Sequence, residues 1–248
     1  MFPILSVGPL ALQMPGLFLL AGIWVGTLLI DREAPRYKLN ANLINNLVLV
    51  ALLAGMVGAR LGYALRFVDA YLREPAGLFS LNPSTLALTE GLVAGLIVAI
   101  FYGQRKKLPF WSTLDALTPS FALFAVFAGL AHLSSGDAFG SESSLPWAIE
   151  LWGARRHPSQ VYEILMALLL FFALLRLRHS APFEGFLFVA FVALSAGGRL
   201  FLEAFRGDSV ILFGVLREAQ MISLLLVLVC LVVLHLLARQ STEVSDQS

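Results

Sequence analysis

Seven apolar stretches, each long enough to cross a lipid bilayer, constrain this chain more than any other feature of its sequence. Of its 248 residues, 58% are hydrophobic and 13% are charged, whereas about 25% are charged in an ordinary soluble domain. A transmembrane helix needs about 20 mainly apolar residues. The sequence therefore predicts an all-α integral membrane protein with seven transmembrane helices. Their predicted bounds are Leu10–Ile30, Leu43–Arg66, Thr85–Tyr102, Thr113–Leu133, Gln160–Leu175, Gly185–Phe205 and Val215–Ala238.

Lysine and arginine residues in the connecting segments predict the orientation of these spans. Positive charges close to transmembrane helices are in excess on the cytoplasmic side. The first, third and fifth connections and the tail together carry nine, namely Arg32, Arg36, Lys38, Arg105, Lys106, Lys107, Arg176, Arg178 and Arg239. The opposite side carries six, namely Arg66, Arg73, Arg155, Arg156, Arg206 and Arg217. We therefore expect the N-terminus outside and the C-terminus in the cytoplasm.

The rest of the sequence predicts one membrane domain without a cofactor. We expect a single transmembrane domain over residues 1–240, an extracytoplasmic loop at about 134–158 and a short polar cytoplasmic tail at 241–248. The first apolar run lacks the basic flank and the cleavage site of a signal peptide, which predicts a retained span. The single cysteine, Cys230, excludes an internal disulfide. A net charge of +1 gives no case for nucleic acid, and the sequence has no nucleotide- or metal-binding motif.

Charged side chains inside the predicted spans gather near the outer ends. Arg199, Glu203 and Arg206 stand at i, i+4 and i+7 in an apolar segment, so they share one helix face. An arginine that faced lipid would cost ~2.5–3.5 kcal/mol. An ion pair that locks two helices avoids this cost. The cost is also avoided if these residues form half of an anion-binding site, because a guanidinium offers phosphate a planar fork of donors. Other polar residues expected at the same side are Arg60, Glu90, His132, Arg156, His157, Gln160, Tyr162, Glu163 and Gln220.

This one-sided distribution favours a binding site over scattered helix contacts. Pairs that only lock helices should occur at all depths, whereas a cluster at one leaflet indicates a site open to that leaflet. Its deepest members, Arg60 and Arg199, are basic. We expect the ligand to be an amphiphile with an anionic headgroup, such as a phospholipid. Asp115 lies at the opposite end of its span and is interpreted as structural.

The run Arg156-His-Pro-Ser-Gln-Val-Tyr-Glu163 opens the fifth span. Proline is tolerated early in a helix because its missing N–H would have no partner there. His157, Gln160 and Glu163 follow at intervals of three, so they form one polar ridge that we expect to face the cluster. The alternative interpretation is a helix cap in which Tyr162 anchors the helix at the membrane interface.

The second span carries small residues at Ala54, Gly58 and Gly62, a spacing that lets helices approach closely. We interpret these three as packing residues. Arg60 lies in the same stretch and needs a partner. A histidine such as His132, taken alone, is more often a capping or water-bonded residue than a catalytic one.

Five segments carry a resemblance to a known family: Ser6-Val-Gly-Pro-Leu-Ala-Leu12, Gly58-Ala-Arg-Leu-Gly-Tyr63, Gly136-Asp-Ala-Phe-Gly140, Arg156–Glu163 and Arg199-x3-Glu203-x2-Arg206. On these segments the chain resembles the bacterial prolipoprotein diacylglyceryl transferases over nearly its whole length. The His-Pro-Ser-Gln-x-Tyr-Glu run is the most specific. The resemblance implies seven spans, an N-terminus outside and no metal. It also implies an enzyme that moves diacylglycerol from phosphatidylglycerol to the cysteine thiol of a lipoprotein signal peptide, at the outer face of the bacterial inner (plasma) membrane.

Three parts of the sequence depart from the family's pattern. The family's His-Gly-Gly reads Thr89-Glu90-Gly91 here, so its histidine is absent. The signature Gly-Arg-x-Gly-Asn reads Ala128-Gly-Leu-Ala-His132, which replaces the arginine by Gly129 and the asparagine by His132. A tyrosine of the first span is Pro15. Arg199 matches the family's essential arginine in the sixth span.

The implied reaction needs a base and a cation. A thiol, with a pKa of ~8.5, needs a base or a positive field to ionise, and the leaving phosphate needs its charge held. Arg199, Arg60 and Arg156 suit the second task. Apolar surroundings raise the pKa of a carboxylate, and histidines titrate near ~6.5, so Glu90 or His132 could accept the proton. We favour His132, with Glu90 orienting it or neutralising Arg60.

The resemblance thus predicts a diacylglyceryl transferase whose partners are phosphatidylglycerol, a prolipoprotein signal peptide and membrane lipid. The alternatives are a catalytically impaired relative that binds anionic phospholipid or signal peptide, and a small membrane transporter. A transporter would show internal repeats with broken helices in matching positions, and neither is visible in the sequence. We expect Arg199, His132 and Glu90 to be catalytic. The expected substrate-binding residues are Arg60, Arg156, His157, Gln160, Tyr162, Glu163, Glu203, Arg206 and Gln220.

Overall fold

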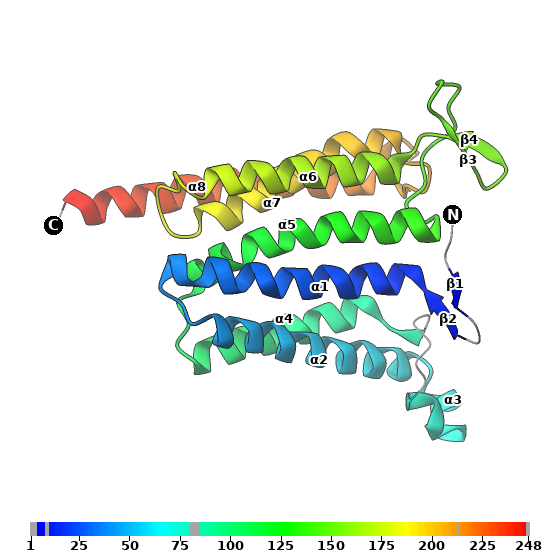
Figure 1. Ribbon diagram of the computed structural model, residues 1–248, viewed down its shortest axis with the longest axis horizontal. Coiled ribbons are helices and arrows are strands. Elements are labelled where there is room, and N and C mark those ends of the chain that lie inside the picture. Colours follow the sequence, from blue (N-terminus) through cyan, green and yellow to red (C-terminus); the bar gives the residue numbers. More distant parts are fainter. Residues whose placement is uncertain (1–3, 8–9, 80–84, 213, 247–248) are drawn as a thin grey trace. The chain divides into compact units, whose positions relative to one another are not determined.

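A computed structural model describes residues 4–7, 10–79, 85–212 and 214–246 of the chain. The chain is mainly helical, and its internal contacts divide it into two compact units (Figure 1). Unit 1 comprises residues 1–33 and 114–248, and unit 2 comprises residues 34–113. The single domain expected over residues 1–240 stays a prediction.

The apolar helices confirm a multi-pass membrane protein. Within the described residues, six helices are long and apolar enough to cross a membrane: Met14–Tyr37, Ala41–Arg66, Phe110–Ser135, Ser159–Leu177, Phe186–Phe205 and Glu218–Thr242. The third predicted span, Thr85–Tyr102, forms helix α4 (Leu88–Arg105), which is not among these six. The count of seven spans and the orientation of the chain stay predictions.

Unit 1 is built from five long helices and three β-hairpins in the part of the chain that the structure describes. The helices are α1 (Met14–Glu33), α5 (Phe110–Ser135, whose first residues belong to unit 2), α6 (Ser159–Leu177), α7 (Phe186–Leu202) and α8 (Glu218–Asp246). A 3-10 turn, Glu203–Phe205, extends α7. The antiparallel hairpins pair β1 (Ile4–Val7) with β2 (Leu10–Gln13), β3 (Ile149–Leu151) with β4 (Ala154–Arg156), and β5 (Ile211–Leu212) with β6 (Leu216–Arg217).

Two predicted spans were wrong at their N-terminal ends. Residues 10–13 form strand β2 instead of the start of the first helix, and residues 215–217 belong to the β5–β6 hairpin instead of the last helix. In both places apolar residues pair as strands, and apolar length alone cannot separate a short strand from a helix. The predicted polar tail after residue 240 continues helix α8 as far as Asp246.

Close approaches and buried polar contacts hold the helices of unit 1 together. The hydroxyl of Ser120 on α5 donates to the carbonyl of Gly26 on α1, at 2.9 Å. The carboxylate of Asp115 accepts hydrogen bonds from the backbone N–H groups of Gly185 (2.7 Å) and Phe188 (2.9 Å). It thereby caps the free donors at the start of α7. These bonds confirm the structural role expected for Asp115.

In its described residues, unit 2 contains two long helices packed through glycines. They are α2 (Ala41–Arg66) and α4, joined by α3 (Val68–Arg73) and a 3-10 turn at Pro75–Phe79, and the unit opens with a 3-10 turn at Ala34–Tyr37. A Cβ atom on Gly91 of α4 would lie 2.7 Å from the carbonyl oxygen of Gly55 on α2, and one on Gly62 would lie 2.6 Å from Cβ of Glu90. Gly58 likewise faces Ala94. The packing role predicted for the small residues of α2 is confirmed at Gly58 and Gly62.

Gly91→Leu should therefore destabilise the protein. The added side chain must push apart two backbones, and overpacking of this kind costs about 1–3 kcal/mol. Gly197→Ala in α7 is the matched control. An added Cβ there meets no atom within 4 Å, and alanine favours a helix over glycine by about 0.5–1 kcal/mol. Thermal melting of the purified protein in detergent measures both, and equal melting temperatures for the two variants would contradict the packing argument.

Candidate active site

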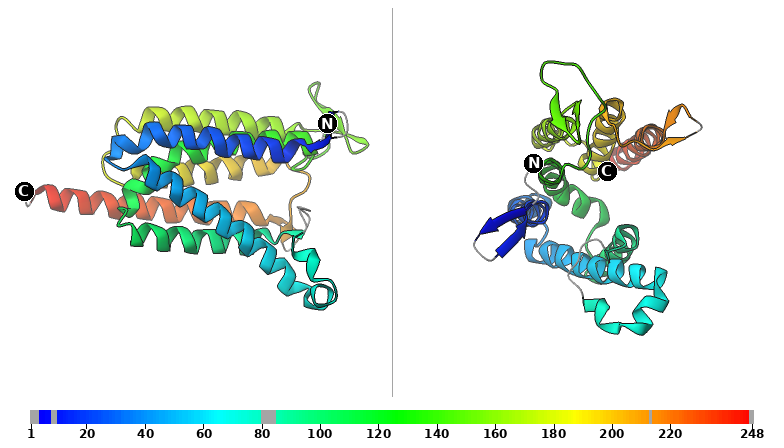
Figure 2. Two further views of the ribbon diagram at one scale, coloured as in Figure 1. Left: turned by 60° about the horizontal axis from the view of Figure 1, so that its bottom comes forward. Right: turned by 90° about the vertical axis from the view of Figure 1, so that its right-hand side faces the viewer.

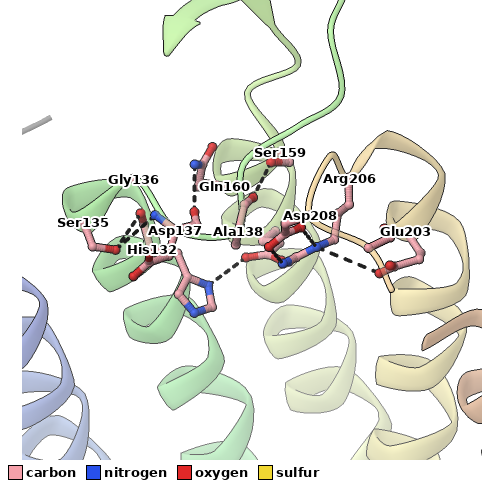
Figure 3. Close-up of polar contacts among 12 residues, drawn as sticks. His132, Ser135, Gly136, Asp137, Ala138, Ser159, Gln160, Glu203, Arg206 and Asp208 are labelled. Atoms are coloured by element: carbon pink, nitrogen blue, oxygen red, sulfur yellow. Dashed lines mark hydrogen bonds and ion pairs between the residues drawn. The ribbon is translucent and has the colours of Figure 1, made fainter. Parts of the chain in front are cut away.

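The carboxylate of Glu163, near the start of α6, is the centre of a polar network in unit 1. Its Oε2 lies 3.0 Å from Nδ1 of His132, in the last turn of α5. Its Oε1 accepts from Nη1 of Arg206 at 2.6 Å and from Nη1 of Arg199 at 3.4 Å. Figure 3 shows His132 and Arg206 reaching toward each other across the start of α6. One carboxylate thus joins side chains from three segments of the chain.

Arg206 is the enclosed cation of this network, with only 10% of its side chain exposed. Its Nε and Nη2 donate to the two oxygens of Asp208, at 2.8 and 2.5 Å. Burial by itself would lower the pKa of Arg206. The hydrogen bonds to Asp208 and the charges of Glu163, Asp208 and Glu203 outweigh it and raise that pKa above its ordinary value. Arg206 is therefore a permanent cation whose charge is already compensated.

Arg199 is the accessible cation, with 40% of its side chain exposed. Its Nε lies 3.0 Å from Oε2 of Glu203, which is 1% exposed, and this confirms the predicted i,i+4 pair. The contact with Glu163 uses Nη1. Among the residues that the structure describes, Nη2 has no hydrogen-bond partner, so Arg199 keeps donors for a ligand.

Two residues that support the network were not predicted from the sequence, Asp208 and Arg217. Nη1 of Arg217, on strand β6, donates to the carbonyl oxygens of Glu203 and Arg206 (the latter at 3.0 Å) and to Oγ of Ser209 at 2.9 Å. It binds free carbonyls where α7 ends, a position that favours cations. The signal in the sequence was weak, because Asp208 and Arg217 read as ordinary loop charges.

An apolar cavity of about 230 Å³ opens from this network between α5, α6 and α7. His132, Glu163 and Arg199 are its charged or titratable lining residues. Small residues make most of the remaining wall: Ala122, Ala125, Ala128, Gly129, Ala167, Ser195 and Gly198. A second apolar groove, of about 410 Å³, lies between α7 and α8 and also reaches Arg199. The accessible guanidinium therefore borders apolar space on both sides of α7.

The first residues of α6 fix the loop that precedes that helix. The hydroxyl of Ser159 donates to the carbonyl of Ala138 at 2.5 Å, and Nε2 of Gln160 donates to that of Asp137 at 2.9 Å (Figure 3). Gln160 is fully buried. Backbone N–H groups of Ser141 and Gly207 bond the carbonyls of Phe205 and Phe139, both at 2.9 Å. The loop is thereby attached to the turn that carries Arg206.

Other predicted substrate-binding residues of unit 1 serve this scaffold. Nδ1 of His157 lies 3.4 Å from Oη of Tyr162, which accepts from Nε1 of Trp147 at 2.8 Å. Arg156 donates to the carbonyl oxygens of Leu151 and Gly140, at 3.1 and 3.3 Å. Nε2 of Gln220 on α8 donates to the carbonyl of Leu200 on α7 at 3.3 Å. Their predicted contacts with substrate stay predictions.

Glu90 and Arg60 belong to unit 2, where each has partners. Glu90 forms an ion pair with Arg66, a partner that the sequence did not predict. Arg60 donates to the carbonyls of Leu78, Gly77 and Thr85, at 2.8, 2.7 and 2.9 Å. These bonds give Arg60 the partners it needs inside a membrane helix. The catalytic role expected for Glu90, its neutralisation of Arg60 and the lipid contact expected for Arg60 stay predictions.

Comparison with known proteins decides what this network belongs to. A family model described as prolipoprotein diacylglyceryl transferase matches residues 3–236. The phosphatidylglycerol–prolipoprotein diacylglyceryl transferase of Clostridioides difficile is 30% identical over 210 residues, covering 85% of this chain and 84% of that protein. Proteins of the same name from Oceanobacillus iheyensis and Trichormus variabilis are 28% and 27% identical, covering 92% and 89% of this chain and 85% and 84% of those proteins.

The chain belongs to the prolipoprotein diacylglyceryl transferase family. It is thus a member of an enzyme family, and the resemblance seen in its motifs is confirmed. The departures from the family pattern fall on the cavity itself, because Gly129 and His132 both line it. A Cβ atom on Gly129 would lie 2.7 Å from Cγ1 of Ile164. Helix α5 thus packs closely against α6 at Gly129, the position to which the resemblance assigns the family's arginine.

Arg206→Met should destabilise the fold strongly. It removes the cation from three carboxylates, and breaking a buried ion pair by deleting one partner costs about 3–5 kcal/mol. Arg155→Met is the control, since Arg155 is exposed and, within the described residues, its side chain donates only to the carbonyl of Leu145 at 3.3 Å. Melting in detergent should separate the two variants clearly. If the Arg206→Met protein proved as stable as the parent, Arg206 would not be the residue that holds the network.

Proposed function

We propose that this chain transfers the diacylglyceryl group of phosphatidylglycerol to the cysteine thiol of a prolipoprotein signal peptide, at the outer face of the bacterial inner membrane. One observation carries the proposal. His132 is hydrogen-bonded to Glu163, Arg199 keeps a free donor, and both residues line one apolar cavity. The relatives' names supply the substrates. In this proposal α4 is the seventh span, the N-terminus lies outside and the C-terminus lies in the cytoplasm.

The lipid binds with its phosphate at Arg199 and its acyl chains in the apolar space beside α7. A guanidinium with an unused donor can bond a phosphate oxygen directly. The cavity follows α5 from His132 to Ala122, ten residues, which at ~1.5 Å per residue is roughly 15 Å of apolar wall. That length suits a long part of an acyl chain. The groove between α7 and α8 offers the second chain a path to the same arginine.

His132 acts as the base that accepts the thiol proton. A carboxylate can only accept hydrogen bonds, so the neutral imidazole beside Glu163 carries its hydrogen on Nδ1. Its Nε2 is then left as a proton acceptor. With 44% of its side chain exposed, His132 can be reached by a substrate. Glu163 orients the ring and stabilises the imidazolium once it forms.

The reaction exchanges one bond for another. The cysteine sulfur attacks the glycerol carbon that bears the phosphate ester, a carbon–sulfur thioether bond forms, and the carbon–oxygen bond to phosphate breaks. The thiol proton goes to His132, and glycerol phosphate leaves with its negative charge held by Arg199. Holding the charge that develops on a leaving group is a large part of catalysis in a site of low dielectric constant.

Transfer from radiolabelled phosphatidylglycerol to a peptide with a lipobox cysteine, catalysed by the purified chain in detergent micelles, is the direct test. In this assay Arg199→Ala should lower the rate by on the order of 10²–10³-fold, as expected for a lost charge-stabilising donor. Arg199→Lys should restore only part of it, because a lysine lacks the planar fork. Arg155→Ala is the control and should keep the parent rate. Full activity in Arg199→Ala would reduce the Arg199–Glu203 pair to a structural contact.

His132→Asn tests the base, and it installs the residue that the family pattern has at this position. Loss of a positioned base should lower the transfer rate by about 10²–10⁴-fold. The remaining activity should recover as pH rises, because hydroxide and free thiolate then replace the base. His179→Asn, at an exposed histidine next to the end of α6, is the control. A parent-like rate and pH profile in His132→Asn would exclude His132 as the base.

One observation favours a second function, a lipid-binding relative without transferase activity. The family's signature arginine is Gly129 here, and the close contact with Ile164 leaves no room for a larger residue. The two functions separate in one experiment. A parent chain that retains phosphatidylglycerol through purification and transfers nothing to the peptide, at any pH, supports the second and excludes the first.

A further inference from the structure

The β5–β6 hairpin of unit 1 exposes apolar side chains that the proposed reaction does not use. Val215, at its turn, is 82% exposed, and Ile211 on β5 is 59% exposed. Val210, Leu212 and Leu216 are exposed as well. Charged residues, Asp208 and Arg217, occur only at the base of this hairpin. A contiguous apolar patch on an aqueous surface marks an interaction site.

The hairpin lies between two candidate membrane spans. It begins just after one candidate membrane span, Phe186–Phe205, and β6 leads directly into the next, Glu218–Thr242. Seen along the helix axes, it extends sideways from the ends of α7 and α8 and away from the other helices of unit 1 (Figure 2). An element that leaves the end of a membrane helix sideways stays at the level of the lipid headgroups and the first acyl carbons.

The backbone of the hairpin sets how deep it can lie. Its strands pair Ile211 with Arg217 and Leu212 with Leu216, and N–H of Glu218 bonds the carbonyl of Val210 at 3.0 Å. The outer edges of a two-stranded hairpin keep N–H and C=O groups that need other partners. Such groups are not tolerated in the hydrocarbon core. Water and lipid headgroups can satisfy them at the interface.

We propose that the β5–β6 hairpin is an in-plane membrane anchor, whose partner is the interface of the phospholipid bilayer itself. Its apolar side chains insert at the boundary between headgroups and acyl chains, while Asp208 and Arg217 remain at the aqueous base. Arg217 then has two roles. It ends the anchor, and its bonds to the carbonyls of Glu203 and Arg206 fasten the anchor to the turn that carries the enclosed cation of the network. The anchor thereby fixes the level of that turn relative to the lipid headgroups.

Spin labelling in vesicles tests this inference without using enzymatic activity, so it stands or fails separately from the proposed transferase function. The only native cysteine is first removed by Cys230→Ala, and a nitroxide is attached to Val215→Cys in vesicles of phosphatidylethanolamine and phosphatidylglycerol. Power-saturation measurements compare collisions with apolar oxygen and with a water-soluble nickel chelate. We expect oxygen collisions to dominate several-fold and to place the label ~5–10 Å below the phosphates, the depth of interfacial elements.

Glu150→Cys on strand β3 is the matched control. Glu150 is exposed on another two-stranded hairpin of unit 1, and its label should collide freely with the nickel chelate. Ile211→Cys repeats the measurement if the label at residue 215 prevents folding. A label at 215 or 211 that is as accessible to the chelate as the one at 150 would overturn the proposal. Shielding from both reagents that grows with the protein-to-lipid ratio would also overturn it, because it would identify a second copy of the chain as the partner.

Discussion

The shared carboxylate of Glu163 is the contact on which the rest of unit 1 depends. Histidine and two arginines approach it from α5, α7 and the turn after α7. Each of these groups would be costly in a membrane helix if it faced lipid. Together they satisfy one another, and each fixes the position of the others. The loop that leads into α6 and the base of the β5–β6 hairpin also form hydrogen bonds to the turn that carries Arg206.

This network is close to electrically neutral, and that decides how it can bind an anion. Arg199 and Arg206 pair with the carboxylates of Glu163, Glu203 and Asp208. A third cation, Arg217, donates to the backbone carbonyl of Glu203, so three cations accompany three carboxylates. An anion is therefore not attracted by an excess of positive charge. In the proposed function an anion binds through donors that the network leaves unused, among them Nη2 of Arg199. The ion pairs with Glu163 and Glu203 hold Arg199 in place at the wall of the apolar cavity, a preorganised arrangement.

Sequence reasoning found what is encoded locally. Apolar length predicted the helices, and the spacing of Arg199 and Glu203 predicted their ion pair, because residues four apart on a helix meet. It failed where the answer depends on distant segments. The partner of Glu90 is Arg66, on another helix of unit 2, and no spacing rule reveals that. Residues 10–13 and 216–217 form strands because a partner segment pairs with each. The three contacts of Glu163 likewise come from elements far apart in sequence.

Two of the departures from the family pattern lie close together on α5. Residues 129 and 132 are three apart, so they share one face of the helix, and both line the cavity. The resemblance assigns the family's arginine to the first position and its asparagine to the second, whereas this chain has Gly129 and His132. The permanent charge is lost, and a titratable group appears one turn further on. In the proposed reaction, His132 becomes an imidazolium when it takes the thiol proton, at the moment when the leaving phosphate develops its charge. In this reaction His132 acts first as the base and then as a cation. The positive charge that is absent at position 129 therefore arises at His132 during the reaction.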